Sequence, residues 1–226
     1  SLSVGLQSNL AEQMSVFGDL TVIEVSPGAE QAGRGGRTTS GRRIDADALA
    51  DMADVAGVAV VTPRVGLQGM MELRWGRSTA FAPYVQGIEP RAAEKLGWVL
   101  QSGHARLARG QIVVGPQLFD DSAFVYLAGA GSAVVGEGGD RGADGGDAPD
   151  ASQLQGRAVI AELTRYDDQG QAVTRGERLH VVGVFEPSGG INDMAIYMAR
   201  ADVEAYNQWF TGERRSAREG YEAAVV

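Results

Sequence analysis

The segment Leu20-Thr-Val-Ile-Glu-Val25 begins the pattern from which the fold class of this chain can be inferred. It is rich in β-branched residues, as is the later run Val58-Ala-Val-Val-Thr-Pro-Arg-Val65, and both runs are apolar enough to form buried strands. Between them, a helix is predicted to begin after Asp45, a good N-cap residue, and to continue until Gly57. Strand, helix and strand in this order predict a βαβ-like unit, which is a packing motif and carries no chemistry by itself.

Regular elements are expected on both sides of this unit. Before it, apolar residues at spacings of three and four predict an amphipathic helix over residues 2–17. Near the other end we expect strands at 178–186 and 195–198, followed by a helix that Gly212 ends. Alternation along the first of these strands places three apolar side chains on one face, namely Leu179, Val181 and Phe185.

The middle of the chain is predicted to be rich in β structure. Short strands are expected at 71–75, 84–88, 112–115, 123–128 and 157–166, and a hairpin turn follows the last of them. We therefore predict an α+β fold in which residues 1–70 and 177–226 form one discontinuous subdomain and residues 71–176 form an inserted β-rich subdomain. Two segments, 33–43 and 129–156, are so rich in glycine and in charge of one sign that they are expected to be mobile or disordered.

The composition excludes several classes of protein. The 226 residues carry a net charge of −9, which argues against a nucleic-acid partner because phosphates require a basic surface. The absence of cysteine removes thiolate metal sites, disulfides and cysteine nucleophiles. No apolar run reaches the length of about 18 residues that a membrane span requires, so a soluble piece is expected. Because the chain starts at Ser1 and stops within an apolar run, we interpret it as a segment of a longer protein.

The motifs of common catalytic sites are missing from the sequence. Residues 28–34 have the spacing of a phosphate-binding loop, but Arg34 stands where a lysine must reach the phosphates. There is no Gly-x-Ser-x-Gly motif and no His-x-x-x-His pair, and the two histidines, His104 and His180, have no readable partner. We therefore assign no catalytic, cofactor-binding or metal-binding residue and expect no cofactor.

One acidic series leaves a second interpretation open. Asp140, Asp144, Asp147 and Asp150 lie in the glycine-rich segment, and calcium accepts oxygen ligands from flexible acidic loops. Their spacing departs from that of a calcium-binding loop, so a solvated insertion is the favoured interpretation and calcium binding is the alternative.

A resemblance to a known family rests on motifs at both ends of the chain and on their order. Together they resemble the extracytoplasmic domain of MacB-type, FtsX-like ABC transporter permeases, the region between the first and second transmembrane helices. The segments that carry the resemblance are Gly5–Met14, Gly18–Val25, Ile44–Met52, Val55–Val58, Val60–Arg64, Leu179–Val184, Pro187–Gly190, Ile196–Met198, Asp202–Val203 and Asn207–Gly212.

The resemblance implies a function that needs no catalytic residue in this chain. In such permeases the discontinuous subdomain is proximal to the membrane, and its first helix continues from a membrane span. A separate cytoplasmic ATPase subunit or domain hydrolyses the nucleotide, and the extracytoplasmic domain relays the motion to an exported substrate or a partner protein. A second permease copy and an extracytoplasmic adaptor are the implied partners, on the outer side of the cell membrane.

The alternative hypothesis is an extracellular module that binds or hydrolyses a small molecule or a peptide between the two subdomains. Such a module requires a deep pocket, and a hydrolytic one requires two or more titratable groups with perturbed pKa values in it. The structure can therefore be used to test the hydrolytic form of this hypothesis.

Overall fold

The computed structural model describes residues 22–26, 43–119, 151–213, 220–221 and 223–226. The predicted helix at 2–17, the predicted strand at 123–128 and the acidic series Asp140 to Asp150 lie outside these residues, as does nearly all of the loop at 33–43. Within the described part of the chain, no helix is both long enough and apolar enough to cross a membrane.

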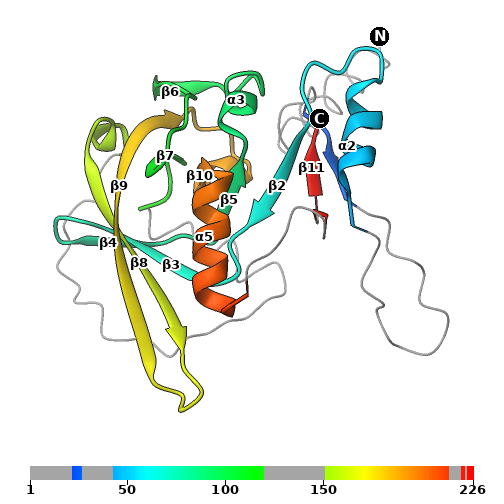
Figure 1. The fold of residues 1–226 in the computed structure, drawn as a ribbon. Helices are drawn as coiled ribbons and strands as arrows, with labels where there is room; N and C mark the ends of the chain where they lie inside the picture. The colour runs from blue at the N-terminus through cyan, green and yellow to red at the C-terminus, as the bar shows by residue number, and fades with distance from the viewer. Residues whose placement is uncertain (1–21, 27–42, 120–150, 214–219, 222) are drawn as a thin grey trace, which may run out of the picture.

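Eleven strands of the described residues form one connected network (Figure 1). Neighbouring strands follow the order β1-β11-β2-β5-β10-β7-β9-β8-β3-β4, and β6 pairs with β9 beside this path. Two pairs, β5 with β10 and β7 with β9, are parallel, and the remaining pairs are antiparallel. The strands are β1 (Glu24–Val25), β2 (Thr62–Gly66), β3 (Met70–Trp75), β4 (Ser78–Phe81), β5 (Tyr84–Ile88), β6 (Leu100–Gly103), β7 (Gln111–Val114), β8 (Ala158–Tyr166), β9 (Ala172–Phe185), β10 (Ala195–Ala199) and β11 (Ala223–Val225).

The described helices are few and short, and this mixed sheet with few helices agrees with the predicted α+β class. They are α2 (Ala46–Ala53), α3 (Pro90–Ala93) and α5 (Arg200–Thr211), together with 3₁₀ turns η1 (Ala151–Leu154) and η2 (Ile191–Met194). The predicted N-cap is confirmed, because Asp45 accepts a hydrogen bond of 2.9 Å from the Ala48 amide. The helix ends before Gly57, which was the expected end. Gly212 ends α5 as predicted, with a positive φ of 75° that favours glycine.

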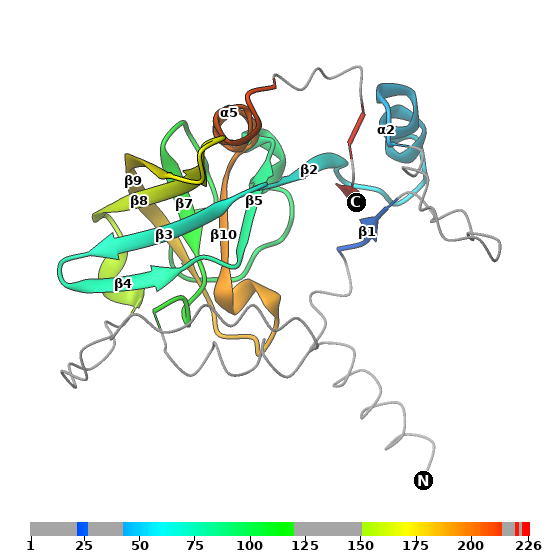
Figure 2. The same cartoon turned by 90° about the horizontal axis from the view of Figure 1, so that it is seen from below.

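The molecule has two parts, which Figures 1 and 2 show side by side. We define the terminal unit as the described residues 22–26, 43–57, 220–221 and 223–226, which include β1, α2 and β11, and we call the larger remainder the body. Strand β2 belongs to both parts, since Thr62, Pro63 and Arg64 pair with β11 while Val65 and Gly66 pair with β5. Both β1 and β2 are antiparallel to β11, so they run parallel to each other with the last strand of the chain between them.

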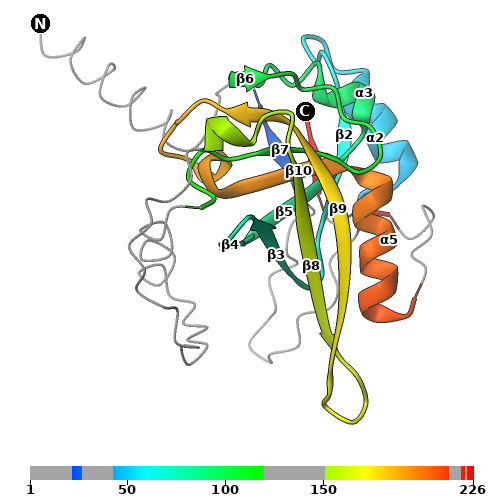
Figure 3. The same cartoon turned by 90° about the vertical axis from the view of Figure 1, so that its left-hand side faces the viewer.

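The sheet of the body contains strands from both predicted subdomains. Strands β9 and β10 come from the range 177–226 or reach into it, and they pair with β5, β6, β7 and β8 from the range 71–176. The β8–β9 hairpin extends beyond the rest of the sheet (Figure 3). The division at residues 70 and 177 stays a prediction.

A β-bulge in β9 places its side chains on different faces from those expected. The register against β7 shifts so that Ile112 pairs with Val181 and the next residue pairs with Gly183. The extra residue reverses the alternation, because successive side chains point to opposite faces of a sheet. Leu179 and Val181 therefore face the main core, as expected, but Phe185 belongs to a second apolar cluster.

The segment expected to be loosely held at 129–156 ends in a packed turn. In η1, Ala151 and Leu154 are 2% and 0% exposed, and both belong to the main core. The expectation of disorder is therefore wrong for residues 151–154, because their two apolar side chains bury surface that offsets the entropy of ordering.

Helix α5 is held against the sheet of the body by close packing and by polar contacts. A Cβ atom at Gly87 would lie 2.9 Å from Val203, so glycine permits the helix to approach β5 this closely. The Asn207 side chain donates to the Gly66 carbonyl at 2.9 Å and accepts from the Gln68 amide at 2.7 Å. The turn between β2 and β3 is thereby tied to the helix.

Candidate functional site

The two ends of the described chain are hydrogen-bonded to each other in the terminal unit. Ile23 and Val226 exchange two backbone hydrogen bonds, each 2.9 Å long. Beyond this pair, Glu24 is opposite Val225 in the antiparallel register of β1 and β11. Strand β11 continues the ladder into β2, which enters the body. A force applied at Ile23 or at Val226 would therefore reach the body through a short run of backbone hydrogen bonds.

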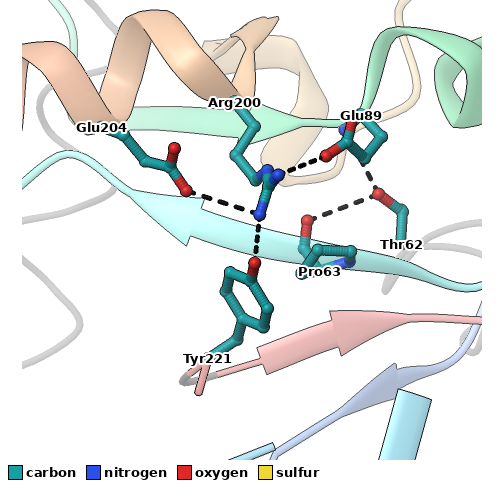
Figure 4. A network of polar contacts seen from close by, with 6 residues as sticks. All are labelled: Thr62, Pro63, Glu89, Arg200, Glu204 and Tyr221. Carbon is teal, nitrogen blue, oxygen red and sulfur yellow. Dashed lines mark hydrogen bonds and ion pairs between the residues drawn. The ribbon is translucent and has the colours of Figure 1, made fainter. Parts of the chain in front are cut away.

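A cluster of polar side chains joins the terminal unit to the body (Figure 4). Arg200, the first residue of α5, forms an ion pair of 2.6 Å with Glu89 and lies 3.5 Å from Glu204. The same guanidinium donates a hydrogen bond to the hydroxyl of Tyr221 and lies over its ring, 5.3 Å from the centroid. Of these four residues only Tyr221 belongs to the terminal unit, so the two carboxylates hold the arginine in position to contact it.

Tyr221 and the neighbouring strand extend this contact into the terminal unit. The Tyr221 backbone exchanges hydrogen bonds of 2.9 and 2.8 Å with Ile44, the residue just before the cap of α2. On the body side, the Glu89 amide donates to the hydroxyl of Thr62 at 3.2 Å, and Thr62 is fully buried in β2. The cluster therefore connects α5, β2 and the start of α2.

The contacts of Arg200 are weak enough to be broken and remade. Its side chain is 23% exposed and that of Glu89 is 43% exposed, and ion pairs of this kind contribute about 0–1 kcal/mol. The Arg200 Nε atom is buried without a hydrogen-bond partner among the described residues. Because one donor is already unsatisfied, the arrangement in which Arg200 contacts Tyr221 is less stable than a fully hydrogen-bonded one would be.

A cavity of about 470 Å³ lies at a second place where the terminal unit meets the body. An ion pair between Glu24 and Arg64 lines it on the side of the terminal unit. On the side of the body, Trp98, Phe185 and Tyr197 form an aromatic cluster with ring centroids 4.7 to 5.5 Å apart.

Four titratable side chains line this cavity. Its titratable lining residues are Glu24, Arg64, Glu186 and Tyr197. Burial raises the pKa of Tyr197, which nearby Arg64 opposes and Glu24 reinforces.

The histidines weighed in the sequence lie at separate elements. His180 is exposed on β9, where its amide donates to the Gly110 carbonyl at 2.9 Å. His104 follows β6 and lines a different cavity together with Glu94 and Arg106, which form an ion pair of 2.8 Å. Across the described residues, no group of three or more histidine and carboxylate side chains is placed to hold a metal ion.

Sequence reasoning missed the residues at the junction. Arg200 and Glu204 have the i,i+4 spacing of a helical ion pair, which is the only local signal. Glu89 and Tyr221 come from distant segments, and no pattern in the sequence indicates that they meet at α5.

Comparison with known proteins gives similarity to solved structures only. No protein-family model matches the sequence, and no curated protein matches it. The periplasmic region of MacB from Actinobacillus actinomycetemcomitans has 15% identity and a TM-score of 0.45, covering 95% of this chain and 77% of that one. The extracellular domain of the noncanonic ABC-type transporter YknZ from Gram-positive bacteria has 12% identity and a TM-score of 0.42, and the match covers 91% of this chain and 82% of that one.

The chain is similar to MacB-like extracytoplasmic domains. This is the class of domain that the motifs in the sequence resemble.

Proposed function

We propose that this chain is the non-catalytic extracytoplasmic domain of an ABC transporter permease, on the outer side of the cell membrane. In this proposal it relays motion from a cytoplasmic ATPase to an exported substrate or to a partner protein such as an adaptor. A second permease copy forms the other half of the transporter. The observation that carries the proposal is the pairing of Ile23 with Val226.

This pairing supports a relay for a mechanical reason. Because Ile23 and Val226 are hydrogen-bonded neighbours, a displacement of either one loads the same small sheet. Strand β2 then carries displacement into the body, while the contact between Arg200 and Tyr221 sets how freely the terminal unit moves relative to α5.

Distance measurements on the intact permease test the relay. The chain contains no cysteine, so Ala50→Cys in α2 and Asp168→Cys at the tip of the β8–β9 hairpin provide two labelling sites in this domain. We expect energy transfer between the two dyes to change when ATP is added, and the change to be smaller in Arg200→Met. Arg91→Met removes an exposed arginine of α3 and serves as the matched control.

The outcomes separate a relay from a passive domain. An ATP-dependent change that Arg91→Met leaves intact and Arg200→Met reduces supports the proposal. If the transporter hydrolyses ATP at its normal rate while energy transfer stays constant, the domain does not relay motion and the proposal is wrong.

A further inference from the structure

Exposed apolar side chains gather at the cavity between the terminal unit and the body. Val99 and Ile191 line it and are 61% and 51% exposed. The described part of the chain has six large hydrophobic residues this exposed, and two of them line this cavity. Exposed apolar side chains beside a cavity favour contact with an apolar occupant.

The wall of the cavity is apolar and aromatic. Ile88, Leu96 and Phe185 are at most 5% exposed and form its floor, and Trp98 and Tyr197 complete the aromatic wall. Its volume of about 470 Å³ is within the range of about 300–1,000 Å³ that is typical of small-molecule sites.

The charged groups of the lining disfavour an anionic occupant. Among the described lining residues Arg64 is the only basic one, and Glu24 neutralises it in an ion pair. Glu186 is exposed at the rim and adds a negative charge. An anion would therefore be repelled, while an uncharged molecule meets no electrostatic penalty. The Tyr197 hydroxyl donates to Asn192 at 2.8 Å, so a polar edge of the occupant can meet this pair.

We propose that this cavity binds a small, uncharged aromatic molecule. The occupant contacts Val22 and Val225 of the terminal unit together with Trp98 and Phe185 of the body, so binding holds the two parts together. The binding does not depend on the relay function proposed above, and a failure of either leaves the other standing.

Fluorescence titration with two matched probes tests the proposal on the full chain. N-phenyl-1-naphthylamine is uncharged, and 8-anilinonaphthalene-1-sulfonate is the same ring system with a sulfonate. We expect the uncharged probe to bind with one-to-one stoichiometry and the sulfonate to bind about tenfold more weakly or worse. Equal or tighter binding of the sulfonate, or no saturable binding of the uncharged probe, would overturn the proposal.

Substitutions at the rim locate the site. Val99→Arg and Ile191→Arg each place a long charged side chain at the cavity, and we expect either to weaken binding of the uncharged probe about tenfold or more. Val55→Arg is the matched control, since Val55 is 57% exposed and does not line the cavity. All three sites are exposed, so the variants should fold, which circular dichroism checks. Equal affinity in the control and in both rim variants would mean that the probe binds elsewhere and that the proposal is wrong.

Discussion

Replacing Arg200 with methionine should weaken the attachment of the terminal unit to the body while leaving the body folded. Methionine retains an unbranched apolar stem and removes the guanidinium, which contacts Tyr221 across the junction and Glu89 within the body. The perturbation therefore removes the contact with Tyr221 between the two parts and the contacts with Glu89 and Glu204 inside the larger part.

The size of the effect follows from these contacts. The hydrogen bond to the Tyr221 hydroxyl, together with the ring contact at 5.3 Å, is worth about 1–1.5 kcal/mol at a partly buried site. Since 1.36 kcal/mol is a factor of ten in an equilibrium constant, opening of the terminal unit should become about 5- to 12-fold more frequent. Loss of the pair with Glu89 adds about 0–1 kcal/mol that acts on the body as well.

Native-state hydrogen exchange measures this effect at individual amides. The amides of Ile44, Tyr221 and Val226 are hydrogen-bonded within the terminal unit and report on its opening. We expect them to exchange about 5- to 12-fold faster in Arg200→Met, while amides of the β8–β9 ladder change by a smaller factor. Tyr221→Phe retains the ring and should produce part of the effect.

Two results would refute this reasoning. An equal acceleration in the terminal unit and in the β8–β9 ladder would mean that Arg200 stabilises the whole domain and does not control the junction. Unchanged exchange at the three reporter amides would mean that its contact with Tyr221 contributes nothing. The control variant Arg91→Met should leave every amide as it is in the unsubstituted chain.

Three further predictions concern the body. Gly115→Ala places a Cβ about 2.1 Å from the Asp193 carbonyl oxygen and should lower the free energy of unfolding by about 2–3 kcal/mol in urea titrations, whereas Gly66→Ala, with 3.9 Å to its nearest neighbour, should cost clearly less. Burial raises the pKa of Tyr206 from 10.0 to about 12. As the pH rises, the unfolded chain therefore loses this proton before the folded chain does, so the free energy of unfolding should fall between about pH 10 and 12, by at most about 1.4 kcal/mol per pH unit. Tyr206→Phe should make that fall smaller. Asn207→Leu leaves two backbone groups of the β2–β3 turn without their partner and should cost about 2–3 kcal/mol in the same titration, while an equal stability would show that water replaces the amide.

Local sequence patterns predicted the elements whose stability depends on neighbours in the chain. The cap at Asp45 and the stop at Gly212 follow from the backbone geometry of helix ends, which a few adjacent residues define. The hairpin turn after β8 was predicted for the same reason, and the Asp167 side chain accepts hydrogen bonds from the amides of Gln169 and Gln171.

The candidate site could not be predicted, because its residues meet only through the tertiary fold. Arg200 and Glu204 are one helical turn apart, but Glu89 and Tyr221 reach them from other strands and loops. The cavity likewise depends on the bulge in β9, which turns Phe185 away from the main core and toward Trp98. A side-chain alternation of period two cannot reveal an extra residue whose position depends on the partner strand.

Propensity, capping and apolar spacing act over a few residues, so local patterns were enough to predict several helices and strands, the α+β class and the resemblance to a family. The position of β11 between β1 and β2, and the sharing of β2 by the terminal unit and the body, depend on the tertiary fold. Strand order depends on which apolar faces can be buried together, and that is a property of the whole chain.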